Sequence, residues 1–359
     1  MTSVLVTGAR GFLGRNLVAR LRMTAGVEVW GVDEGDDMWG PLREAEVVYH
    51  LAGVNRPKEE GEFERVNAGL TRALVEKLEE WGRRPLVVFA SSIQAELENA
   101  YGRSKRAAEE VLAGWGGPVR VYRLKNLFGK FSRPNYNSVV ATFCHKAARG
   151  EELEVHDGGR ELELSYVDDV VDAMVGEMRG EAGAVGSFRV TVGELAERIR
   201  AIAESRKTLV VPDMGDRLTV CLRATYLSYV PAAEREVRLE VRRDERGSLA
   251  EFLKTEGAGQ IFVSRTAPGV TRGNHYHETK TEKFFVVEGE GLLKMRRVDG
   301  EEVEEYRLSG GAYQVVDIPP GWTHSITNVG EGEMVTLFWA SEIFDPGRPD
   351  TYFLAVEGA

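Results

Sequence analysis

The chain has 359 residues, and at roughly 150 residues per domain this length predicts two domains, or one large domain with an appendage. Its 46 Lys and Arg residues against 57 Asp and Glu residues give a net charge of -11, which argues against a nucleic-acid partner, because no broad face would attract a phosphate backbone. With 43% hydrophobic and 29% charged residues the chain can bury a core, so global disorder is excluded.

The first 130 residues alternate short β-branched runs with longer helical patterns, which predicts a parallel sheet covered by helices. The predicted strands are Val4–Thr7, Val27–Val32, Val47–Leu51, Leu86–Ala90 and Val119–Arg123. The predicted helices are Gly14–Arg22, Phe63–Trp81, Tyr101–Gly114, Thr142–Arg149, Asp168–Arg179 and Val192–Ser205. This half should therefore be an α/β, doubly wound domain of the Rossmann type.

The pattern changes from Val237 onward, where short alternating strands follow one another with glycine-rich turns and no intervening helices. Such spacing predicts an all-β sandwich or barrel. Pro231 interrupts the chain just before this change, so we expect one domain at residues 1–235 and a second at residues 236–359. The predicted strands are Gln260–Arg265, Lys283–Glu288, Gly291–Arg297, Tyr313–Ile318 and Met334–Ala340.

A glycine-rich turn follows the first strand, where residues 7–14 read T-G-A-R-G-F-L-G. Glycines at such a turn let a helix N-terminus approach a pyrophosphate, whose charge then meets free amides and the positive end of the helix dipole. The spacing is G-x-x-G-x-x-G, and the alternative is a purely structural turn. The candidate cofactor-binding residues here are Gly8, Arg10, Gly11, Phe12, Leu13 and Gly14.

Asp33 follows the second strand, 25 residues beyond Gly8. A carboxylate at this place would hydrogen-bond the adenosine ribose and repel a 2′-phosphate, which favours NADH over NADPH. Glu34 reinforces the effect, whereas Arg10 opposes it weakly. The alternative is that Asp33 only begins a loop.

Tyr101 and Lys105 stand at i and i+4, on one face of a predicted helix. An ammonium near a phenol should lower its pKa, so the pair could exchange a proton with a carbonyl oxygen as hydride moves. Ser91 and Ser92 follow the strand Leu86–Ala90, and their hydroxyls could polarise the same carbonyl. Together with the glycine turn and in this order, these residues resemble the extended short-chain dehydrogenase/reductase family, which implies catalytic roles for all four and a cofactor contact for Lys105.

Other segments match the same family. The turn Leu51-Ala52-Gly53 resembles a cofactor-contacting turn, and Asn126 lies in a segment that resembles a substrate-side turn. Asp168 lies in Tyr166-Val167-Asp168-Asp169, which resembles a helix start of this family, and we interpret it as a helix N-cap. Ser92 is followed by Ile93-Gln94-Ala95, without the Asp-Glu pair of nucleotide-sugar 4,6-dehydratases, so dehydration is not expected.

Three of the six histidines fall in one pattern in the second half of the chain. Residues two apart on a strand face the same side, so His275 and His277 could point into one barrel, with Glu282 entering from the next stretch and His324 from a strand across it. Three imidazoles and a carboxylate suit zinc, manganese, iron or nickel, and we expect a divalent metal with zinc as the first candidate. The spacing resembles the two motifs of the cupin family. The alternative is a cupin that has kept its shape and lost its metal.

Four further segments extend the resemblance over essentially the whole chain, to the CapF family of bifunctional capsular-polysaccharide enzymes. They are Asn55-Arg56-Pro57, Asn135-Tyr136-Asn137-Ser138, Arg272-Gly273-Asn274-His275-Tyr276-His277 and Phe344-Asp345-Pro346. The resemblance implies that Asn135 and Asn137 contact substrate and that the cupin half epimerises C3 of a UDP-2-acetamido-2,6-dideoxy-4-hexulose. The reductase half would then reduce the C4 ketone, giving UDP-2-acetamido-2,6-dideoxy-L-talose. The family uses NADPH and carries basic residues where this chain has Asp33-Glu34, so both cofactors stay open.

A 4-keto group makes the C3 proton removable, and the candidates for the base are Lys280, Lys283 and Tyr276, by proximity in the sequence alone. Two rival functions remain: a plain ketosugar reductase whose cupin only dimerises the protein, and an iron-dependent oxygen-using barrel. The resemblance implies a homodimer formed through the cupin half.

The cellular compartment is suggested by three kinds of absence in the sequence. Cys144 and Cys221 have no partner spacing, no apolar run could span a bilayer, and Ser3-Val4-Leu5-Val6 begins a strand with no preceding basic leader. We therefore expect a cytoplasmic protein with no membrane partner.

Overall fold

The computed structural model describes residues 1–57, 59, 61–181 and 183–357, and the chain divides into two compact units. The first unit comprises Met1–Arg200 and Val220–Pro231, and the second comprises Ala201–Thr219 and Ala232–Ala359. The chain thus passes between the units more than once. The single boundary at residue 235 stays a prediction.

The first unit contains a five-stranded sheet in the order β2-β1-β3-β4-β5, in which all neighbours are parallel. This order confirms the predicted Rossmann-like fold, because successive strands lie on opposite sides of β1 and create a switch point at its carboxyl end. Each predicted strand is present to within two residues at either end. The observed strands are β1 Thr2–Thr7, β2 Val27–Val32, β3 Val47–His50, β4 Leu86–Ser92 and β5 Val119–Leu124.

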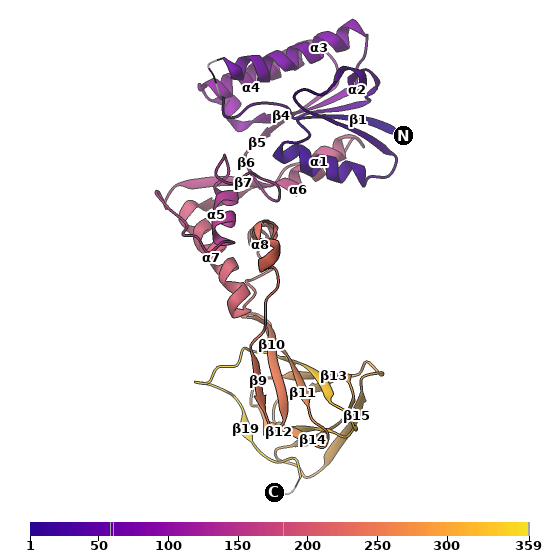
Figure 1. The fold of residues 1–359 in the computed structure, drawn as a ribbon, viewed down its shortest axis with the longest axis vertical. Coiled ribbons are helices and arrows are strands. Elements are labelled where there is room, and N and C mark those ends of the chain that lie inside the picture. The colour runs from indigo at the N-terminus through magenta and orange to yellow at the C-terminus, as the bar shows by residue number, and fades with distance from the viewer. Residues whose placement is uncertain (58, 60, 182, 358–359) are drawn as a thin grey trace. The chain divides into compact units, whose positions relative to one another are not determined.

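Helices cover both faces of this sheet (Figure 1). Leu17 and Leu21 of α1 and Met174 of α6 are buried in one core, whereas Leu74 of α3 and Leu112 of α4 are buried in the other. The apolar stripe of each amphipathic helix thus faces the sheet, as its periodicity predicts. The elements of this layer are α1 Phe12–Arg22, α2 Trp39–Glu44, η1 Glu64–Gly69, α3 Leu70–Glu80, η2 Ile93–Glu96, α4 Ala100–Trp115 and α6 Val167–Glu177.

A three-stranded sheet in the order β6-β7-β8 follows the parallel sheet in sequence, with β7 parallel to β6 and antiparallel to β8. These strands were not predicted: β6 and β8 have only three and four residues, and the alternation of β7, E-L-E-L-S-Y, was overlooked. The elements are β6 Asn126–Phe128, β7 Glu161–Tyr166, β8 Phe188–Thr191, α5 Val139–Ala147, α7 Val192–Thr208 and α8 Arg217–Tyr229.

The second unit consists of two antiparallel sheets, in the orders β16-β13-β18-β11-β10-β9 and β15-β14-β17-β12-β19. Phe284 and Phe338 of the first sheet and Leu293 and Ile326 of the second form one buried core, as expected of a cupin-like β domain. The elements are η3 Ala232–Glu234, β9 Val241–Asp244, β10 Gly247–Thr255, β11 Gly259–Thr266, β12 Thr271–Tyr276, β13 Glu282–Glu288, β14 Glu290–Arg297, β15 Val303–Ser309, β16 Val315–Ile318, β17 Trp322–Asn328, β18 Met334–Ala340 and β19 Tyr352–Phe353.

Within the described part of the chain, the helices are all too short or too polar to cross a bilayer.

Candidate functional site

The glycine turn lies at the carboxyl end of β1, against the turn that follows β3. Gly8 has φ +70°, and a Cβ on it would lie 2.8 Å from the Ala52 nitrogen; a Cβ on Gly14 would lie 2.1 Å from the Gly8 oxygen. Only glycine fits at these two positions. Gly11 is the N-cap of α1 and makes no side-chain cap bond, so the amides of Phe12 and Leu13 begin the helix beside the turn, as a dinucleotide-binding loop requires.

Asp33, the predicted ribose ligand, is held next to the glycine turn. Its Oδ2 accepts a hydrogen bond from the Arg10 nitrogen at 2.5 Å, and its own nitrogen donates to Asp36 Oδ2 at 2.9 Å. The Arg10 guanidinium is engaged by the same carboxylates, at 3.6 Å from Asp33 and 3.0 Å from Asp36. Arg10 therefore lies between two negative charges.

Tyr101, Ser92 and Lys105 come together above the carboxyl end of β4. The Tyr101 side chain hydrogen-bonds Ser92, whose Oγ also accepts from the Gln94 nitrogen at 3.2 Å and so caps η2. Lys105 is buried, and its Nζ donates to the Ala90 carbonyl oxygen at 2.9 Å. Asn99 caps α4 through the Gly102 nitrogen at 2.7 Å, which fixes the start of the helix that carries both residues.

The pKa values at this site differ from the expected ones. Burial raises the pKa of Tyr101, against a smaller lowering by the hydrogen bond with Ser92, so the predicted lowering by Lys105 is wrong. Desolvation outweighs a lysine whose ammonium is bonded elsewhere. Burial also lowers the pKa of Lys105 to about 8, with Glu109 acting in the opposite direction. Tyr101 is consequently protonated at neutral pH, the form that can donate a proton.

Ser91 differs from Ser92 in its surroundings. Its hydroxyl donates to Glu109, which is also paired with Arg123 at 2.7 Å. The hydroxyl of Ser91 is therefore committed to this ion pair, and a role in polarising a carbonyl stays a prediction without geometric support.

A chain of buried hydrogen bonds fixes the turn after β3. The Ala52 nitrogen donates to Thr7 Oγ1, which donates to His50 Nδ1 at 2.9 Å; His50 Nε2 then donates to Thr71, and Thr71 to the Asn67 carbonyl. Burial lowers the pKa of His50 to about 3, so this ring is neutral and structural. The predicted cofactor turn is thereby tied to β1 and α3.

Asn67 is a positioning residue that the sequence analysis missed. Its side chain accepts from the Val54 nitrogen at 2.8 Å and donates to the Val54 carbonyl and to Ser104. A Cβ on Gly53 would lie 2.8 Å from Asn67 Oδ1 and 3.3 Å from Lys105 Nζ. The turn Leu51-Ala52-Gly53 therefore lies beside Lys105. The signal was a polar residue on the apolar face of an amphipathic helix.

The three predicted substrate asparagines lie outside this cluster. Asn126 is exposed, and its Nδ2 donates to the Glu163 carbonyl at 3.4 Å. Asn135 has φ 55° and its nitrogen donates to Thr142. Asn137 accepts from Arg56 Nε at 2.6 Å.

Asp168 is not a helix N-cap. Helix α6 begins at Val167, so Tyr166 is the N-cap, and Asp168 lies in the first turn, where it pairs with Lys130.

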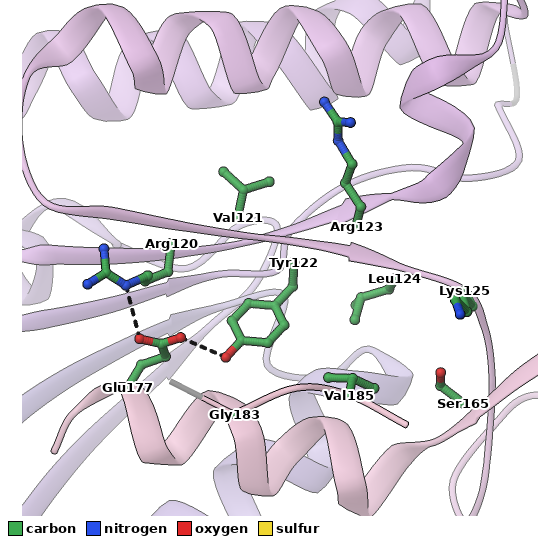
Figure 2. A pocket seen from close by; sticks show the side chains of 10 residues that line it. All are labelled: Arg120, Val121, Tyr122, Arg123, Leu124, Lys125, Ser165, Glu177, Gly183 and Val185. Atoms are coloured by element: carbon green, nitrogen blue, oxygen red, sulfur yellow. Dashed lines mark hydrogen bonds and ion pairs between the residues drawn. The ribbon is translucent and has the colours of Figure 1, made fainter. Parts of the chain in front are cut away.

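A cavity of about 350 Å³ along the edge strand β5 contains none of the predicted site residues. Figure 2 shows Glu177 between Arg120 and Tyr122, with hydrogen bonds of 3.1 and 2.8 Å. Burial and the nearby carboxylate raise the pKa of Tyr122. These contacts stabilise the buried carboxylate of Glu177, so we assign this cluster a structural role.

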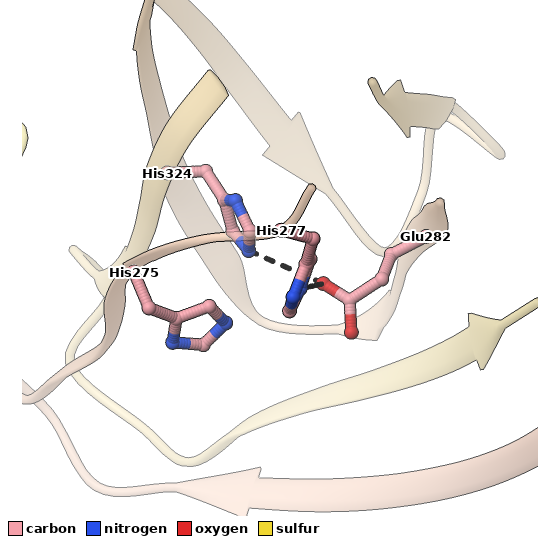
Figure 3. Close-up of side chains that lie close together, drawn as sticks. All are labelled: His275, His277, Glu282 and His324. Carbon is pink, nitrogen blue, oxygen red and sulfur yellow. Dashed lines mark ion pairs between the residues drawn. The ribbon is translucent and has the colours of Figure 1, made fainter. Parts of the chain in front are cut away.

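In the second unit, His275, His277, Glu282 and His324 converge between the two sheets (Figure 3). One ligand atom of each lies within 4.8 Å of the others, and Glu282 Oε2 is 3.2 Å from Nε2 of both His277 and His324. A metal with ligands at about 2.1 Å places adjacent donor atoms at about this separation. The set thus fits a metal in number, type and spacing.

The strand geometry of this cluster differs from the prediction in two respects. His324 lies on β17, directly opposite His275 on β12, so the two share a face as neighbours and not across the barrel; Glu282, on β13, comes from the other sheet. His277 lies one residue beyond the end of β12, so strand alternation does not place it. A bulge between Gly273 and His275 sets the register instead, and Gly273 is required there, because a Cβ would lie 2.7 Å from the His324 oxygen.

Backbone carbonyls orient the three imidazoles. His277 Nδ1 donates to the Asp350 carbonyl at 2.6 Å, His324 Nδ1 lies 3.2 Å from the Trp322 carbonyl, and the His275 ring bonds the Gly273 backbone. The Nε2 atoms of His277 and of His324 are buried and face Glu282, with no hydrogen-bond partner among the described residues. Such orphaned nitrogens facing a carboxylate suit metal ligation.

The same cluster shifts the pKa values of its members. Burial lowers the pKa of His275 to about 4, with help from His324. Burial would raise the pKa of Glu282, but His277 and His324 together hold it well below its usual range. A neutral imidazole at His275 and an ionised carboxylate at Glu282 are forms that bind metal.

Of the three candidate bases for C3, Lys280 is hydrogen-bonded to backbone, Lys283 points outward and Tyr276 is stacked on another ring. Buried Lys280 Nζ donates to the Pro349 carbonyl at 2.7 Å. Lys283 follows inward-facing Glu282, so strand alternation points it outward, where it pairs with Asp317. Tyr276 stacks on Tyr352 with ring centroids 5.2 Å apart.

Two family models match the chain. The NAD dependent epimerase/dehydratase family matches residues 4–186, and the polysaccharide biosynthesis C-terminal domain matches residues 242–352. The UDP-2-acetamido-2,6-beta-L-arabino-hexul-4-ose reductase of Pseudomonas aeruginosa is 43% identical over 99% of this chain and 100% of its own length. The capsular polysaccharide assembling protein CapF from Staphylococcus aureus is 41% identical, with a TM-score of 0.92 over 99% of this chain and 100% of that one.

The chain belongs to the CapF family. The resemblance to this family, which was predicted from short motifs, is thus confirmed over 99% of the chain. A UDP-glucuronic acid 4-epimerase from Bacillus cereus in complex with NAD, 18% identical with a TM-score of 0.53, covers 63% of this chain and 98% of that one, and shares the fold alone.

Proposed function

We propose that this CapF-family enzyme converts a UDP-2-acetamido-2,6-dideoxy-4-hexulose in two steps, on the way to a surface polysaccharide. The second unit epimerises C3, and the first unit reduces the C4 ketone with NAD(P)H, giving UDP-2-acetamido-2,6-dideoxy-L-talose. One observation carries the proposal: each unit holds its own buried polar cluster, one built around a protonated phenol and one around three imidazoles and a carboxylate.

The reductase step needs a proton donor at the ketone oxygen. A nicotinamide cofactor supplies the hydride when bound at the glycine turn. Tyr101 donates the proton, since burial keeps it in the acid form, and Ser92 orients the phenol through their hydrogen bond. Lys105, with Nζ beside the turn at Gly53, provides positive charge for the tyrosinate that forms.

The pKa of Lys105 predicts how the reduction rate depends on pH. Because this pKa is lowered to about 8, Lys105 is charged below that pH and neutral above it. The kcat for ketone reduction should therefore fall as pH rises through about 8. A profile measured between about pH 6 and pH 10 tests this, with Lys105→Met expected to be slow and to lack the transition. A wild-type kcat that is constant across the range would refute it.

The epimerisation step needs negative charge to be stabilised when C3 loses its proton. The residues that would hold a divalent metal, proposed to be zinc, are His275, His277, Glu282 and His324. When bound, the cation would supply positive charge to stabilise the negative charge that develops on the sugar. The chain's own contribution is to orient the three imidazoles through the carbonyls of Gly273, Trp322 and Asp350.

We propose NADH as the preferred cofactor, because Asp33 and Asp36 surround Arg10 and leave it unable to favour a 2′-phosphate. The wild-type enzyme should show a kcat/KM for NADH at least about tenfold above that for NADPH, since opposed like charges are costly. Asp33→Asn should reduce that preference, whereas Asp37→Asn, which keeps a capping side chain for the Trp39 nitrogen, should not change it. A preference for NADPH in the wild-type enzyme would overturn this assignment.

The alternative is a plain UDP-4-ketosugar reductase whose cupin serves structure or dimerisation. We propose that the protein is a homodimer formed through the cupin unit, and this holds for either function. Incubating the protein with the ketosugar and each cofactor, and identifying the product by NMR, separates the two. Inverted configuration at C3 supports the bifunctional enzyme, and retained configuration with a reduced C4 supports the alternative.

A further inference from the structure

Two arginines contact the ring of Tyr136 in the first unit. The Arg56 guanidinium lies 5.0 Å from the ring centroid and that of Arg133 lies 5.3 Å from it. Arg56 comes from the turn after β3, whereas Arg133 and Tyr136 come from the segment between β6 and α5. Both guanidinium groups approach one ring, so they lie no more than about 10 Å apart.

These arginines are exposed, and no described acidic side chain neutralises their charge. Arg56 uses its Nε for Asn137 at 2.6 Å, which leaves both terminal nitrogens of its fork. Among the residues described by the structure, no carboxylate pairs with either guanidinium, although the chain carries 57 acidic residues and a net charge of -11. Two like charges held together on one ring favour an anion between them.

Their chemistry selects the anion. A guanidinium fork matches phosphate oxygens in a bidentate manner, and Tyr136 restricts both forks without using their donors. Two such forks close together suit a group with two linked phosphates better than a single carboxylate.

The location links this pair of arginines to the proposed reductase centre. A Cβ on Gly53 would lie 3.3 Å from Lys105 Nζ, and Arg56 follows Gly53 by three residues, within about 11 Å along the chain. In a sugar nucleotide the diphosphate is attached at C1, across the ring from the C4 ketone that would face Tyr101. We infer that Arg56 and Arg133, held on Tyr136, bind the diphosphate of the sugar nucleotide; this assignment rests on the proposed reductase function for its physiological ligand.

The chain offers a matched control. Arg84 also contacts an aromatic ring, with its guanidinium 5.4 Å from the centroid of Trp115. It lies before β4, at the amino-terminal edge of the parallel sheet, away from the edge where Tyr101 lies. Loss of Arg84 removes a cation and a ring contact but not a phosphate ligand.

The test is calorimetric titration of the full-length protein with UDP, UMP and uridine. Arg56→Ala and Arg133→Ala should each raise the Kd for UDP about tenfold or more, with smaller effects on UMP and little on uridine. Arg56→Lys should fall between Arg56→Ala and the wild type, and Arg84→Ala should leave all three affinities unchanged. Raised salt should weaken UDP binding to the wild type more than to either alanine variant.

Three results would overturn the assignment: no UDP binding by the wild type, unchanged UDP affinity in both alanine variants, or an equal loss of uridine affinity. The outcome is independent of catalysis. If the arginine variants lose UDP affinity while the wild type fails to reduce the ketosugar, the diphosphate site stands and the proposed function fails. If the wild type reduces the ketosugar while both variants keep full UDP affinity, the site fails alone.

Discussion

Tyr101→Phe should lower the rate of ketone reduction by about 10² to 10⁴-fold, because it removes the proton donor together with its hydrogen bond to Ser92. The ring remains in place against Phe63, whose centroid is 5.6 Å away, so folding should be preserved. Ser92 keeps its cap on η2 through the Gln94 nitrogen. The loss should appear in kcat, with the affinity for NADH unchanged, since the phenol is required only as the transition state forms. Cofactor oxidation, followed under saturating conditions, measures it.

The control for this variant removes a phenol elsewhere. Tyr313 is 81% exposed in the second unit, and Tyr313→Phe should leave reduction unchanged. A Tyr101→Phe enzyme within tenfold of the wild-type rate would show that another group donates the proton. An equal loss of deuterium exchange at C3 of the 4-keto sugar in the same variant would contradict separate sites for epimerisation and reduction.

His275→Ala should lower metal affinity by at least about hundredfold, since loss of a direct ligand should cost no less than loss of an outer partner. His275 faces His324 across paired strands with ring centroids 4.6 Å apart, and three ligands on two sheets would remain. Exchange at C3 should be lost with the metal, while NADH binding to the first unit is retained. Elemental analysis after dialysis against a chelator of known affinity measures the metal, and fluorescence titration measures the cofactor.

His156 provides the matched control, because its side chain is 91% exposed and lies in the first unit. His156→Ala should keep both the metal and the exchange activity. A His275→Ala protein that retains stoichiometric metal would exclude His275 from the ligand set. One that loses its metal but still exchanges C3 would leave the metal with a structural role.

Local sequence patterns predicted those parts of the fold whose signals are local. The strand Val27–Val32 and the strand Met334–Ala340 have the bounds that were predicted, because β-branched and alternating residues define them. The glycine turn was also predicted from local sequence. Gly8 and Gly14 are required by close backbone contacts within this turn and with the neighbouring turn after β3.

The four side chains of the candidate metal site lie close together, but their geometry differs from the predicted one. Spacing in the sequence suggested that His277 continues a strand, whereas a bulge at Gly273 and a carbonyl from Asp350 place it. Asp350 also accepts from the nitrogens of Glu278 and Lys280, and these bonds lower its pKa. No local pattern could show a contact made by a segment 70 residues away.

The electrostatic prediction for Tyr101 failed for a similar reason. Proximity to Lys105 in a helix suggested a lowered pKa, but the size of that effect depends on burial and on the partner of the ammonium. In the folded chain Lys105 is bonded to Ala90, and desolvation dominates. The contact of Arg56 with Tyr136 could not be predicted for the same reason, since it joins segments far apart in the chain.

Deuterium exchange at C3 of the 4-keto sugar, in D2O and without any nicotinamide cofactor, tests the two-site account most directly. We predict that the wild-type protein incorporates deuterium at C3, that chelation abolishes the incorporation, and that Tyr101→Phe retains it. Absence of incorporation in the untreated protein would contradict the account.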